Sequence, residues 1–265
     1  MWTEKRQQTL SQNFLHDPRL VKSLVRHSSI GPNDTILEIG PGKGIITRQL
    51  LAVARQVIAV EIDKNLVEYL LQGLANAHLT LFHTDFFQFP LPRTPYKVFA
   101  NLPFHIEGEV VRKLLEADNP PEEAQVVVLR DVGYRWSGFK CEGVFSLLYK
   151  PWFEMTIAYH FKRSDFVPKP KLKVAMLRIV KRREALIGNK ERKEYAHFLR
   201  IAFGGGGRIN KNLSECFGKR QLGNLAAKLG FSVFAKPSEL NLKQWLGLFE
   251  NFRRQQKPLS QVSKN

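Results

Sequence analysis

The stretch TILEIGPGKG (residues 35–44) joins a run of apolar residues to a turn that holds three glycines. An apolar run that ends at such a turn is typical of a buried strand in a parallel sheet. Glycines at this place supply positive φ angles and let a ligand approach the backbone closely. A phosphate-binding loop would end in Gly-Lys-Ser or Gly-Lys-Thr, whereas this turn ends in Gly-Lys-Gly. The stretch therefore predicts the first strand of an α/β sheet, followed by a binding turn that is not built for a pyrophosphate.

Further strands and helices are expected to alternate along the front of the chain. Apolar runs with the character of strands are VIAVEID (57–63), LTLFHTD (79–85), KVFANLP (97–103) and QVVVLR (125–130). Segments with the apolar spacing of a helix lie between them, such as ITRQLLAVA (46–54) and KNLVEYLLQGLA (64–75). This alternation predicts βαβ units and a Rossmann-like, doubly wound α/β sheet. Two later runs, residues 153–161 and 174–180, are expected to form an antiparallel hairpin at the sheet edge.

Beyond Arg183 the pattern changes to helices alone. Each of the segments 190–203, 220–230 and 241–252 has an apolar stripe with basic residues opposite. The change predicts a small all-helical C-terminal domain, with a boundary near residues 181–189. We expect a catalytic domain over residues 1–182 and a helical, basic RNA-binding domain over residues 183–265.

The charge of the chain is concentrated in its last two-fifths. The formal net charge is +17, from 41 Lys and Arg against 24 Asp and Glu. The part from Lys162 onward holds 24 of the basic and 7 of the acidic residues, so the part before it is neutral. A basic protein can simply carry diffuse charge, but so sharp an asymmetry favours one part that performs chemistry and another that binds a polyanion.

Other classes of protein are not expected. No run reaches the roughly 18 apolar residues that a membrane span needs, and the N-terminus lacks the apolar stretch of a secretory signal. Cys141 and Cys216 lie far apart and have no metal-ligand spacing around them, as is also true of the histidines. We expect a cytoplasmic protein with reduced thiols, no metal site, no membrane partner and no need for more than a monomer.

Two carboxylates at predicted strand ends suit a nucleoside cofactor. Glu61 ends the second strand, 21 residues beyond Gly40, where an acidic side chain can accept hydrogen bonds from ribose hydroxyls. Asp85 ends the third strand and can accept from an adenine amino group, while Phe86 covers the ring. Alternatively, Glu61 could be a solvated carboxylate and Asp85 could cap a turn. The presence of both beside the glycine turn at Gly40 and Gly42 favours the binding of a cofactor.

The four residues Asn101-Leu102-Pro103-Phe104 close the fourth predicted strand and indicate the chemistry. The amino nitrogen of adenine is a poor nucleophile because its lone pair is delocalised into the ring. Acceptors from the Asn101 side chain and the Leu102 carbonyl would localise that lone pair toward a methyl sulfonium. Pro103 stiffens the turn, and Phe104 offers a face on which a flipped-out base can stack. Catalysis would then depend on positioning and electrostatic alignment, and His105 is expected to shape the pocket and not to act as a base.

With these motifs the chain resembles the erythromycin-resistance (Erm) rRNA adenine methyltransferases, close relatives of the KsgA-type rRNA adenine dimethyltransferases. The resemblance covers nearly the whole chain, through SQNFL (11–15), LEIGPGKG (37–44), VEID (60–63), HTDFFQF (83–89), NLPF (101–104) and FVPKPK (166–171). It implies S-adenosylmethionine as cofactor and a Rossmann-like catalytic domain followed by a helical RNA-binding domain. The cofactor contacts that it implies are Asn13, Leu15, Gly40, Glu61, Asp85 and Asn101.

The resemblance also implies how the RNA is held. Phe166 would be a second stacking face beside the target adenine. Basic residues around the expected mouth of the site would hold RNA phosphates, although each alone reads equally well as a solvated side chain. These residues are Arg130, Arg163, Lys169, Lys171 and Lys173.

Two segments depart from the family pattern. The run FHIEG (104–108) stands where most relatives have Tyr-Asn-Ile-Ser-Thr, and LRDVGYRWSG (129–138) lacks the usual Glu-x-Gly-Phe-Ala-like run. These departures favour the Erm branch, which methylates an adenine of 23S rRNA and blocks macrolide-type antibiotics. Three alternatives stay open: a KsgA-type enzyme acting on 16S rRNA, a non-catalytic RNA-binding protein with the same fold, and a DNA adenine methyltransferase.

Overall fold

A computed structural model describes residues 13–74 and 77–256, which form two compact units. The first contains the described residues up to Gly133 together with Glu154–Lys181. The second contains Tyr134–Phe153 and the described chain from Arg182 onward. Residues 134–153 thus pack with the helical C-terminal part, although they precede two strands of the sheet. The assignment of catalysis to residues 1–182 and of RNA binding to residues 183–265 remains a prediction.

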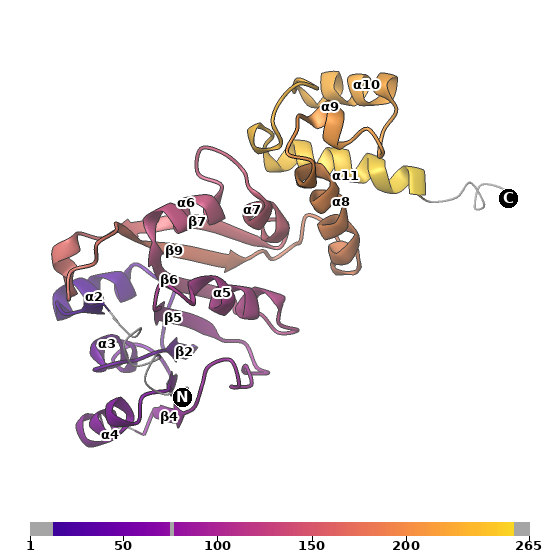
Figure 1. Ribbon diagram of the computed structural model, residues 1–265. Coiled ribbons are helices and arrows are strands. Elements are labelled where there is room, and N and C mark those ends of the chain that lie inside the picture. The colour runs from indigo at the N-terminus through magenta and orange to yellow at the C-terminus, as the bar shows by residue number, and fades with distance from the viewer. Residues whose placement is uncertain (1–12, 75–76, 257–265) are drawn as a thin grey trace, which may run out of the picture. The chain divides into compact units, whose positions relative to one another are not determined.

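The first unit is built on a seven-stranded sheet (Figure 1). In spatial order its strands are β4 (Leu79–His83), β3 (Gln56–Glu61), β2 (Thr35–Ile39), β5 (Lys97–Asn101), β6 (Glu123–Leu129), β9 (Val174–Lys181) and β7 (Phe153–His160). The first five are parallel, and β9 runs antiparallel to β6. The predicted doubly wound sheet is confirmed, and the two runs expected at its edge are neighbours there.

Burial explains why the strands were visible in the sequence. All five residues of β2 are buried, as are the first six of β6, because parallel strands are covered on both faces. The chain leaves β2 toward β3 and β4 on one side and returns to β5 and β6 on the other. Ligands of open α/β sheets bind at such a switch point, beyond the carboxyl ends of the strands. Here those ends are Gly40, after β2, and Asn101, the last residue of β5.

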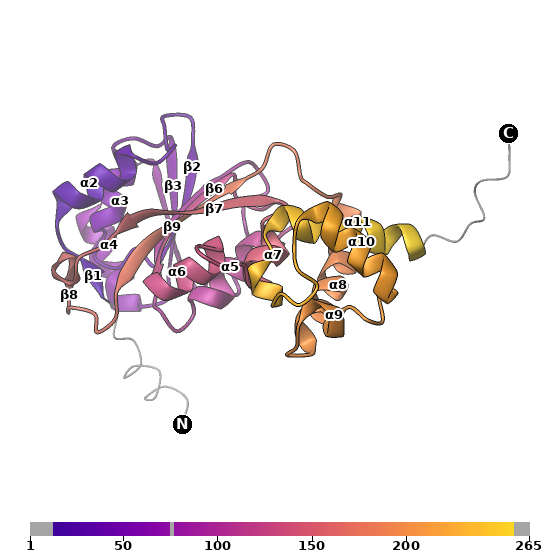
Figure 2. The same cartoon turned by 90° about the horizontal axis from the view of Figure 1, so that it is seen from above.

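Helices lie against the sheet, with α2 and α3 next to each other (Figures 1 and 2). Those of the first unit are α2 (Pro18–Arg26), α3 (Ile45–Leu51), α4 (Lys64–Gly73), α5 (Glu107–Glu116) and the start of α6 (Arg130–Ser137), with a 3-10 turn at Arg163–Asp165. The helices expected near residues 46–54 and 64–75 are α3 and α4. A separate two-stranded sheet pairs β1 (Phe14–Leu15) with β8 (Phe166–Val167) in antiparallel register.

The second unit is helical around an aromatic core. Its helices are the rest of α6, α7 (Val144–Tyr149), α8 (Arg192–Gly204), α9 (Ile209–Asn212), α10 (Lys219–Leu229) and α11 (Leu242–Gln256), with 3-10 turns at Asn189–Glu191 and Pro237–Glu239. Tyr195, Phe198, Trp245 and Phe249 are fully or almost fully buried, and their rings meet at centroid distances of 4.9–6.0 Å. The three helices expected after Arg183 are α8, α10 and α11. No described helix is long and apolar enough to cross a membrane.

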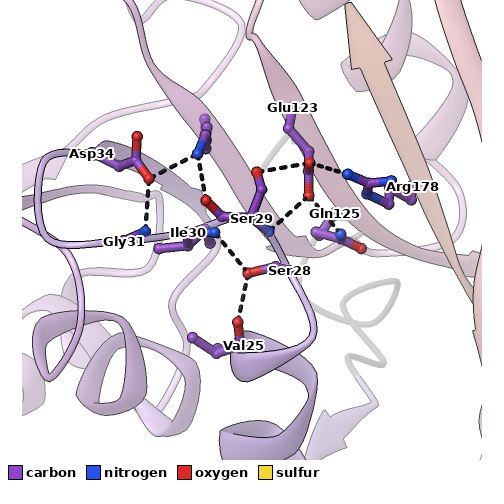
Figure 3. A network of polar contacts seen from close by, with 10 residues as sticks. Val25, Ser28, Ser29, Ile30, Gly31, Asp34, Glu123, Gln125 and Arg178 are labelled. Carbon is purple, nitrogen blue, oxygen red and sulfur yellow. Dashed lines mark hydrogen bonds and ion pairs between the residues drawn. The ribbon is translucent and has the colours of Figure 1, made fainter.

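A polar network ties the segment after α2 to the sheet (Figure 3). The buried carboxylate of Glu123, at the start of β6, accepts from Ser29 Oγ at 2.8 Å, Gln125 Nε2 at 2.8 Å and Arg178 Nη2 at 2.7 Å. Lys97 continues the network through Asp34 at 2.8 Å. Burial alone would raise the pKa of Glu123, but the hydrogen bonds from Arg178, Gln125 and Ser29 together hold it below its ordinary value.

Replacing Glu123 by Ala is expected to lower the free energy of unfolding by about 2–3 kcal/mol, because Arg178 and Ser29 lose their partner. The side chain of Arg178 is 39% exposed, which keeps the cost below that of a fully buried pair. The contribution should be present above the ordinary Glu pKa of 4.5 and be lost as the pH falls through the lower value of the folded state. Urea unfolding at several pH values measures both effects.

Glu122→Ala is the matched control, because that neighbouring side chain is exposed and has no partner among the described residues. It should change the free energy of unfolding by less than about 0.5 kcal/mol. Equal effects of the two substitutions would contradict the assigned role of the network.

Candidate active site

The glycine turn after β2 has the backbone that the sequence predicted. Gly40, Gly42 and Gly44 have φ angles of 67°, 57° and 76°. A Cβ at Gly42 would lie 2.7 Å from Cε1 of Phe14, so any side chain there would push against the N-terminal segment. A Cβ at Gly40 would meet nothing within 4 Å, since this glycine borders open space. The turn therefore leaves room for a ligand at Gly40 and is closed by Phe14 at Gly42.

Glu61 connects the end of β3 to this turn. Its Oε1 accepts the N–H groups of Ile62 at 2.9 Å and Asp63 at 3.0 Å, and its Oε2 accepts that of Gly42 at 3.1 Å. The side chain is buried, and burial raises its pKa although these hydrogen bonds act in the opposite direction. A carboxylate has capacity for further donors, so Glu61 can accept ribose hydroxyls while it holds the turn.

Glu38 is a second carboxyl group beneath the turn, and the sequence motifs did not identify it as a site residue. It is fully buried in β2, and neither of its oxygens makes a hydrogen bond of normal geometry within the described chain. Burial, with a smaller contribution from the charge of Glu61, raises its pKa to about 8, although hydrogen bonding to Thr47 partly opposes the shift. The group is therefore mostly protonated at neutral pH. Its signal in the sequence was an acidic residue inside an otherwise apolar strand.

A cavity of about 460 Å³ lies at the carboxyl ends of β3 and β4. Glu61, Asp85, Phe86 and Gly40, all predicted cofactor residues, line it. Phe87, which was not predicted, lines it too and is 38% exposed, whereas the ring of Phe86 is mostly buried. Carboxylates beside apolar walls fit the ribose and ring of a nucleoside.

Lys113 organises the wall of this cavity from α5. Its ammonium group donates to the carbonyls of Phe86 at 2.6 Å, Phe87 at 3.0 Å and Phe89 at 2.8 Å. It also lies 4.7 Å from the ring centroid of Phe86. Burial lowers the pKa of Lys113, and the charge of Asp85 raises it. Lys113 thus fixes the loop that carries Phe86 and Phe87. No sequence motif predicted this role for the lysine.

Asn101 joins the sheet to two distant segments. Its Nδ2 donates to the carbonyl of Asn13 at 2.8 Å, and Nδ2 of Asn13 donates to the carbonyl of Pro168 at 2.7 Å. No described residue donates to Oδ1 of Asn101, so this oxygen stays available as an acceptor. Asn101, Leu15 and Gly40 line a second cavity of about 350 Å³. Ser11 and Gln12, the start of the SQNFL motif, lie outside the described residues.

The rest of the Asn-Leu-Pro-Phe motif reaches the first cavity through Pro103. Pro103 and His105 line it. The side chain of Leu102 is buried, and within the described chain no hydrogen bond reaches its carbonyl oxygen. The half-buried ring of Phe104 packs against the hydrophobic core on one side. The roles expected of the Leu102 carbonyl as an acceptor and of the Phe104 ring as a stacking face stay predictions.

Glu107, which departs from the family pattern, has a structural partner. It is the first residue of α5 and is buried, and its Oε2 accepts the N–H of Leu129 at 3.0 Å. This bond connects the helix after the motif to the end of β6. Glu107 is therefore not an exposed charge at an RNA entrance.

Phe166 lies in the core and has no exposed face. It is 0% exposed, and its ring meets that of Phe161 at a centroid distance of 5.2 Å. A role as a second stacking surface would require this ring to be uncovered. Its neighbour Val167 is the exposed residue of β8 and lines the cavity that contains Asn101.

The five predicted phosphate-binding cations differ in their partners. Arg130 pairs with Asp131 at 3.0 Å, and Nε of Arg163 donates to the carbonyl of Pro170 at 2.7 Å. Lys169, Lys171 and Lys173 are exposed on the segment after β8, and no described residue pairs with them. Those three lysines are thus free to bind an anion. Within residues 13–74 and 77–256, no group of three His, Cys, Asp or Glu residues is placed to hold a metal.

Comparison with known proteins identifies the family. The sequence model of the family described as "Ribosomal RNA adenine dimethylase" matches residues 3–252. The chain belongs to this family. It is an S-adenosylmethionine-dependent rRNA adenine N6-methyltransferase.

Relatives of the methyltransferase carry two kinds of name. An "rRNA adenine N-6-methyltransferase" of Bacteroides fragilis is 29% identical over 90% of each chain, and one of Corynebacterium diphtheriae is 32% identical over 74% of this chain and 77% of its own. A "Ribosomal RNA small subunit methyltransferase A" of Mycoplasmopsis pulmonis is 31% identical over 72% of this chain and 77% of its own. Among solved structures, the 23S rRNA methyltransferase ErmE has a TM-score of 0.84 at 27% identity, covering 91% of this chain and all of that one.

The residues of the methyltransferase fit S-adenosylmethionine. The nucleoside part suits the larger cavity, where Glu61, Asp85 and Phe87 lie. The remainder suits the second cavity, beside Asn101 and Leu15, and Gly40 lines both. Nothing lies within 4 Å of the position where a Cβ of Gly40 would stand.

Replacing Lys113 by Met is expected to raise the KM for S-adenosylmethionine about three- to tenfold and to leave kcat nearly unchanged. The substitution keeps most of the length of the side chain and removes the donor to three carbonyls, so the aromatic wall loosens. Steady-state methylation and calorimetric cofactor binding measure the effect. Arg112→Met, one position earlier on the exposed side of α5, should leave the KM for the cofactor unchanged; a similar rise in both variants would refute the role of Lys113.

Replacing Glu38 by Gln is expected to remove a pH-dependent cost of folding. The pKa of Glu38 is about 8 in the folded chain against an ordinary 4.5, so the folded state holds the proton more tightly. The wild type should therefore lose stability relative to the variant as the pH rises from 4.5 to 8, by up to about 1.4 kcal/mol per pH unit, and level off above it. Urea unfolding of both proteins from pH 5 to 9 tests this, and a constant difference would disprove it.

Proposed function

We propose that the enzyme methylates the exocyclic amino group of an adenine in 23S rRNA and so confers resistance to macrolide-type antibiotics. The observation that carries this proposal is the likeness to ErmE, described as a 23S rRNA methyltransferase, over the full length of that chain. The Bacteroides fragilis relative, which matches 90% of this chain, is named as an rRNA adenine N-6-methyltransferase. A dimethyladenosine transferase from Plasmodium falciparum has a lower TM-score of 0.73.

The arrangement of Asn101 supports a mechanism based on positioning. With Nδ2 held by the carbonyl of Asn13, Oδ1 of Asn101 is the free acceptor at the end of β5. This oxygen and the carbonyl of Leu102 would accept the two hydrogens of the adenine amino group. With both hydrogens held in this way, the lone pair of the amino nitrogen is less delocalised into the adenine ring. It then points away from the two acceptors.

The cofactor, when bound, supplies a methyl group on a positively charged sulfur, which becomes a neutral thioether once the group is transferred. The amino nitrogen forms the new bond and releases a proton to water. Asn101 need not act as a base, because its acceptors align the nucleophile before the transfer. Phe104 would stack on the flipped adenine and hold it against these acceptors.

The basic residues support an RNA substrate. The unpaired lysines Lys169, Lys171 and Lys173 follow the strand that pairs with the N-terminal segment, and they are close in sequence to Val167 of the second cavity. We infer that they bind phosphates beside the target nucleotide, while Arg130 and Arg163 would first have to leave their present partners.

We further infer that the enzyme acts as a monomer in the cytoplasm.

The proposal is tested by transfer of tritiated methyl groups from S-adenosylmethionine to protein-free 23S rRNA, to 16S rRNA and to immature small subunits. Label on 23S rRNA alone is expected. Asn101→Ala should lower kcat by about 100-fold or more, because one of two oriented acceptors is lost. Calorimetry should still detect cofactor binding to the variant, since Glu61 and Asp85 are unchanged.

The second candidate is the modification of 16S rRNA, favoured by the relative from Mycoplasmopsis pulmonis. Label on immature small subunits and none on 23S rRNA would establish it in place of the first. Absence of label on every RNA, with cofactor binding intact, would leave only a binding role for the fold.

A further inference from the structure

The second cavity of the active site, of about 350 Å³, has an unpaired cation in its wall. Lys43 lines this cavity from the glycine turn between β2 and α3 (Figure 1). The residue is exposed, and within the described chain its ammonium group has no ion pair and no hydrogen bond. An unpaired lysine at the wall of a ligand cavity can bind an anionic part of the ligand.

The backbone of the turn fixes the point from which Lys43 extends. The N–H of Gly44 donates to the carbonyl of Pro41 at 2.9 Å. This bond closes a β-turn whose two central residues are Gly42 and Lys43. The carboxylate of Glu61 accepts the N–H of Gly42 at 3.1 Å and so connects the turn to the end of β3. When an anion binds, only the side chain of Lys43 has to become ordered, which keeps the entropic cost of binding low.

Lys43 gives the second cavity a positive charge. The described residues that line the cavity include no Asp or Glu. Their other titratable member is His16, whose Nε2 lies 2.7 Å from the carbonyl oxygen of Ser164 and therefore donates to it. Most of the remaining wall is apolar and consists of Phe14, Leu15, Pro41, Ile45, Ile46 and Val167. Apolar walls limit the access of water, so a charge beside them is screened less than on an open surface.

The first cavity has the opposite charge. Glu61, Asp85 and Glu109 line it, and its described lining residues include no Lys or Arg. Gly40 lines both cavities, so the two are adjacent. The carboxylates of the first cavity repel an anionic group, and the ammonium group of the second attracts it.

This distribution of charge matches the ends of S-adenosylmethionine. The cofactor has one anionic group, the α-carboxylate, which lies at the end of the molecule opposite the adenine. With the nucleoside in the cavity of Glu61 and Asp85, the carboxylate belongs in the cavity of Lys43. A carboxylate accepts charge-assisted hydrogen bonds from an ammonium group, and the flexible stem of lysine lets that group adjust to its position.

We propose that Lys43 binds the α-carboxylate of S-adenosylmethionine and thereby selects a cofactor that carries this group. Lys43 positions the amino-acid end of the cofactor and takes no part in the transfer of the methyl group. The proposal concerns the cofactor alone and is independent of the RNA target, so it can be tested without RNA.

The experiment compares two ligands that differ by the carboxylate, by calorimetry in the absence of RNA. Decarboxylated S-adenosylmethionine lacks this group and keeps the adenosine, the sulfonium and the amine. Lys43→Met should raise the dissociation constant for S-adenosylmethionine about tenfold, because a charge-assisted hydrogen bond is lost. The dissociation constant for the decarboxylated ligand should change by less than about twofold. The wild type should therefore prefer S-adenosylmethionine, and the variant should lose most of that preference.

Two further variants control for charge and for folding. Lys43→Arg keeps the positive charge and should keep most of the preference for the carboxylate. Lys22→Met removes the same charge from an exposed position on α2 that lines neither cavity and has no partner within the described chain. It should leave both dissociation constants unchanged. Circular dichroism and thermal unfolding establish that all three variants are folded.

Two outcomes would overturn the proposal. If Lys43→Met weakened the binding of both ligands equally, the substitution would have disturbed the turn and not a contact with the carboxylate. If it changed neither dissociation constant, Lys43 would not contact the cofactor, and a raised KM for RNA in methyl transfer would assign it to a phosphate of the target nucleotide. Failure of the proposed function looks different, because the wild type would then label no 23S rRNA while its preference for the carboxylate persisted.

Discussion

The hydrogen bond from the Asn101 side chain to the carbonyl of Asn13 is the constraint on which the rest of the active site depends. It fixes the last residue of a central strand to a segment 88 positions earlier, and Asn13 passes the connection on to Pro168. Because Nδ2 of Asn101 is used in this bond, Oδ1 is the side-chain atom that remains to accept a hydrogen bond from the substrate. The same contacts hold the pair of short strands β1 and β8 beside the glycine turn, where Phe14 closes the space over Gly42.

Much of the sheet was predictable from the sequence because its parallel strands are buried on both faces. Runs such as TILEI and QVVVL are therefore mostly apolar, and each is followed by a glycine or a polar residue. Gly40, Glu61, Asp85 and Asn101 were predictable for the related reason that strand ends meet at one edge of a sheet. The structure brings all four to the walls of its two cavities.

What the sequence could not give were contacts between segments with no common pattern. Lys113 looks like any lysine on the polar side of a helix, and only the fold places it on three carbonyls of a loop some 25 residues earlier. Glu107 departs from the family pattern, and the structure explains it by the hydrogen bond that its carboxylate accepts from the N–H group of Leu129. A local sequence pattern cannot predict a bond between residues so far apart in the chain. Phe166 is a different case, because its motif suggested a stacking face beside the target adenine whereas its ring is 0% exposed in the fold. Residues 134–153 pack with the helical unit through contacts that no local pattern shows, such as that of the Trp152 ring with the Tyr195 ring at a centroid distance of 6.3 Å.

The lack of a side chain at Gly40 has a consequence for inhibitor design. Both cavities are lined by this residue, and the space above its α-carbon is open. Two weakly binding fragments, one flat and one extended, can therefore be joined by a slender linker that passes over the glycine. The linked compound would gain affinity from the restriction of its two halves to neighbouring positions. A variant enzyme that escaped such a compound by placing a methyl group in its path would have an L-residue at a φ of 67°, so escape by this route would carry a cost in backbone strain.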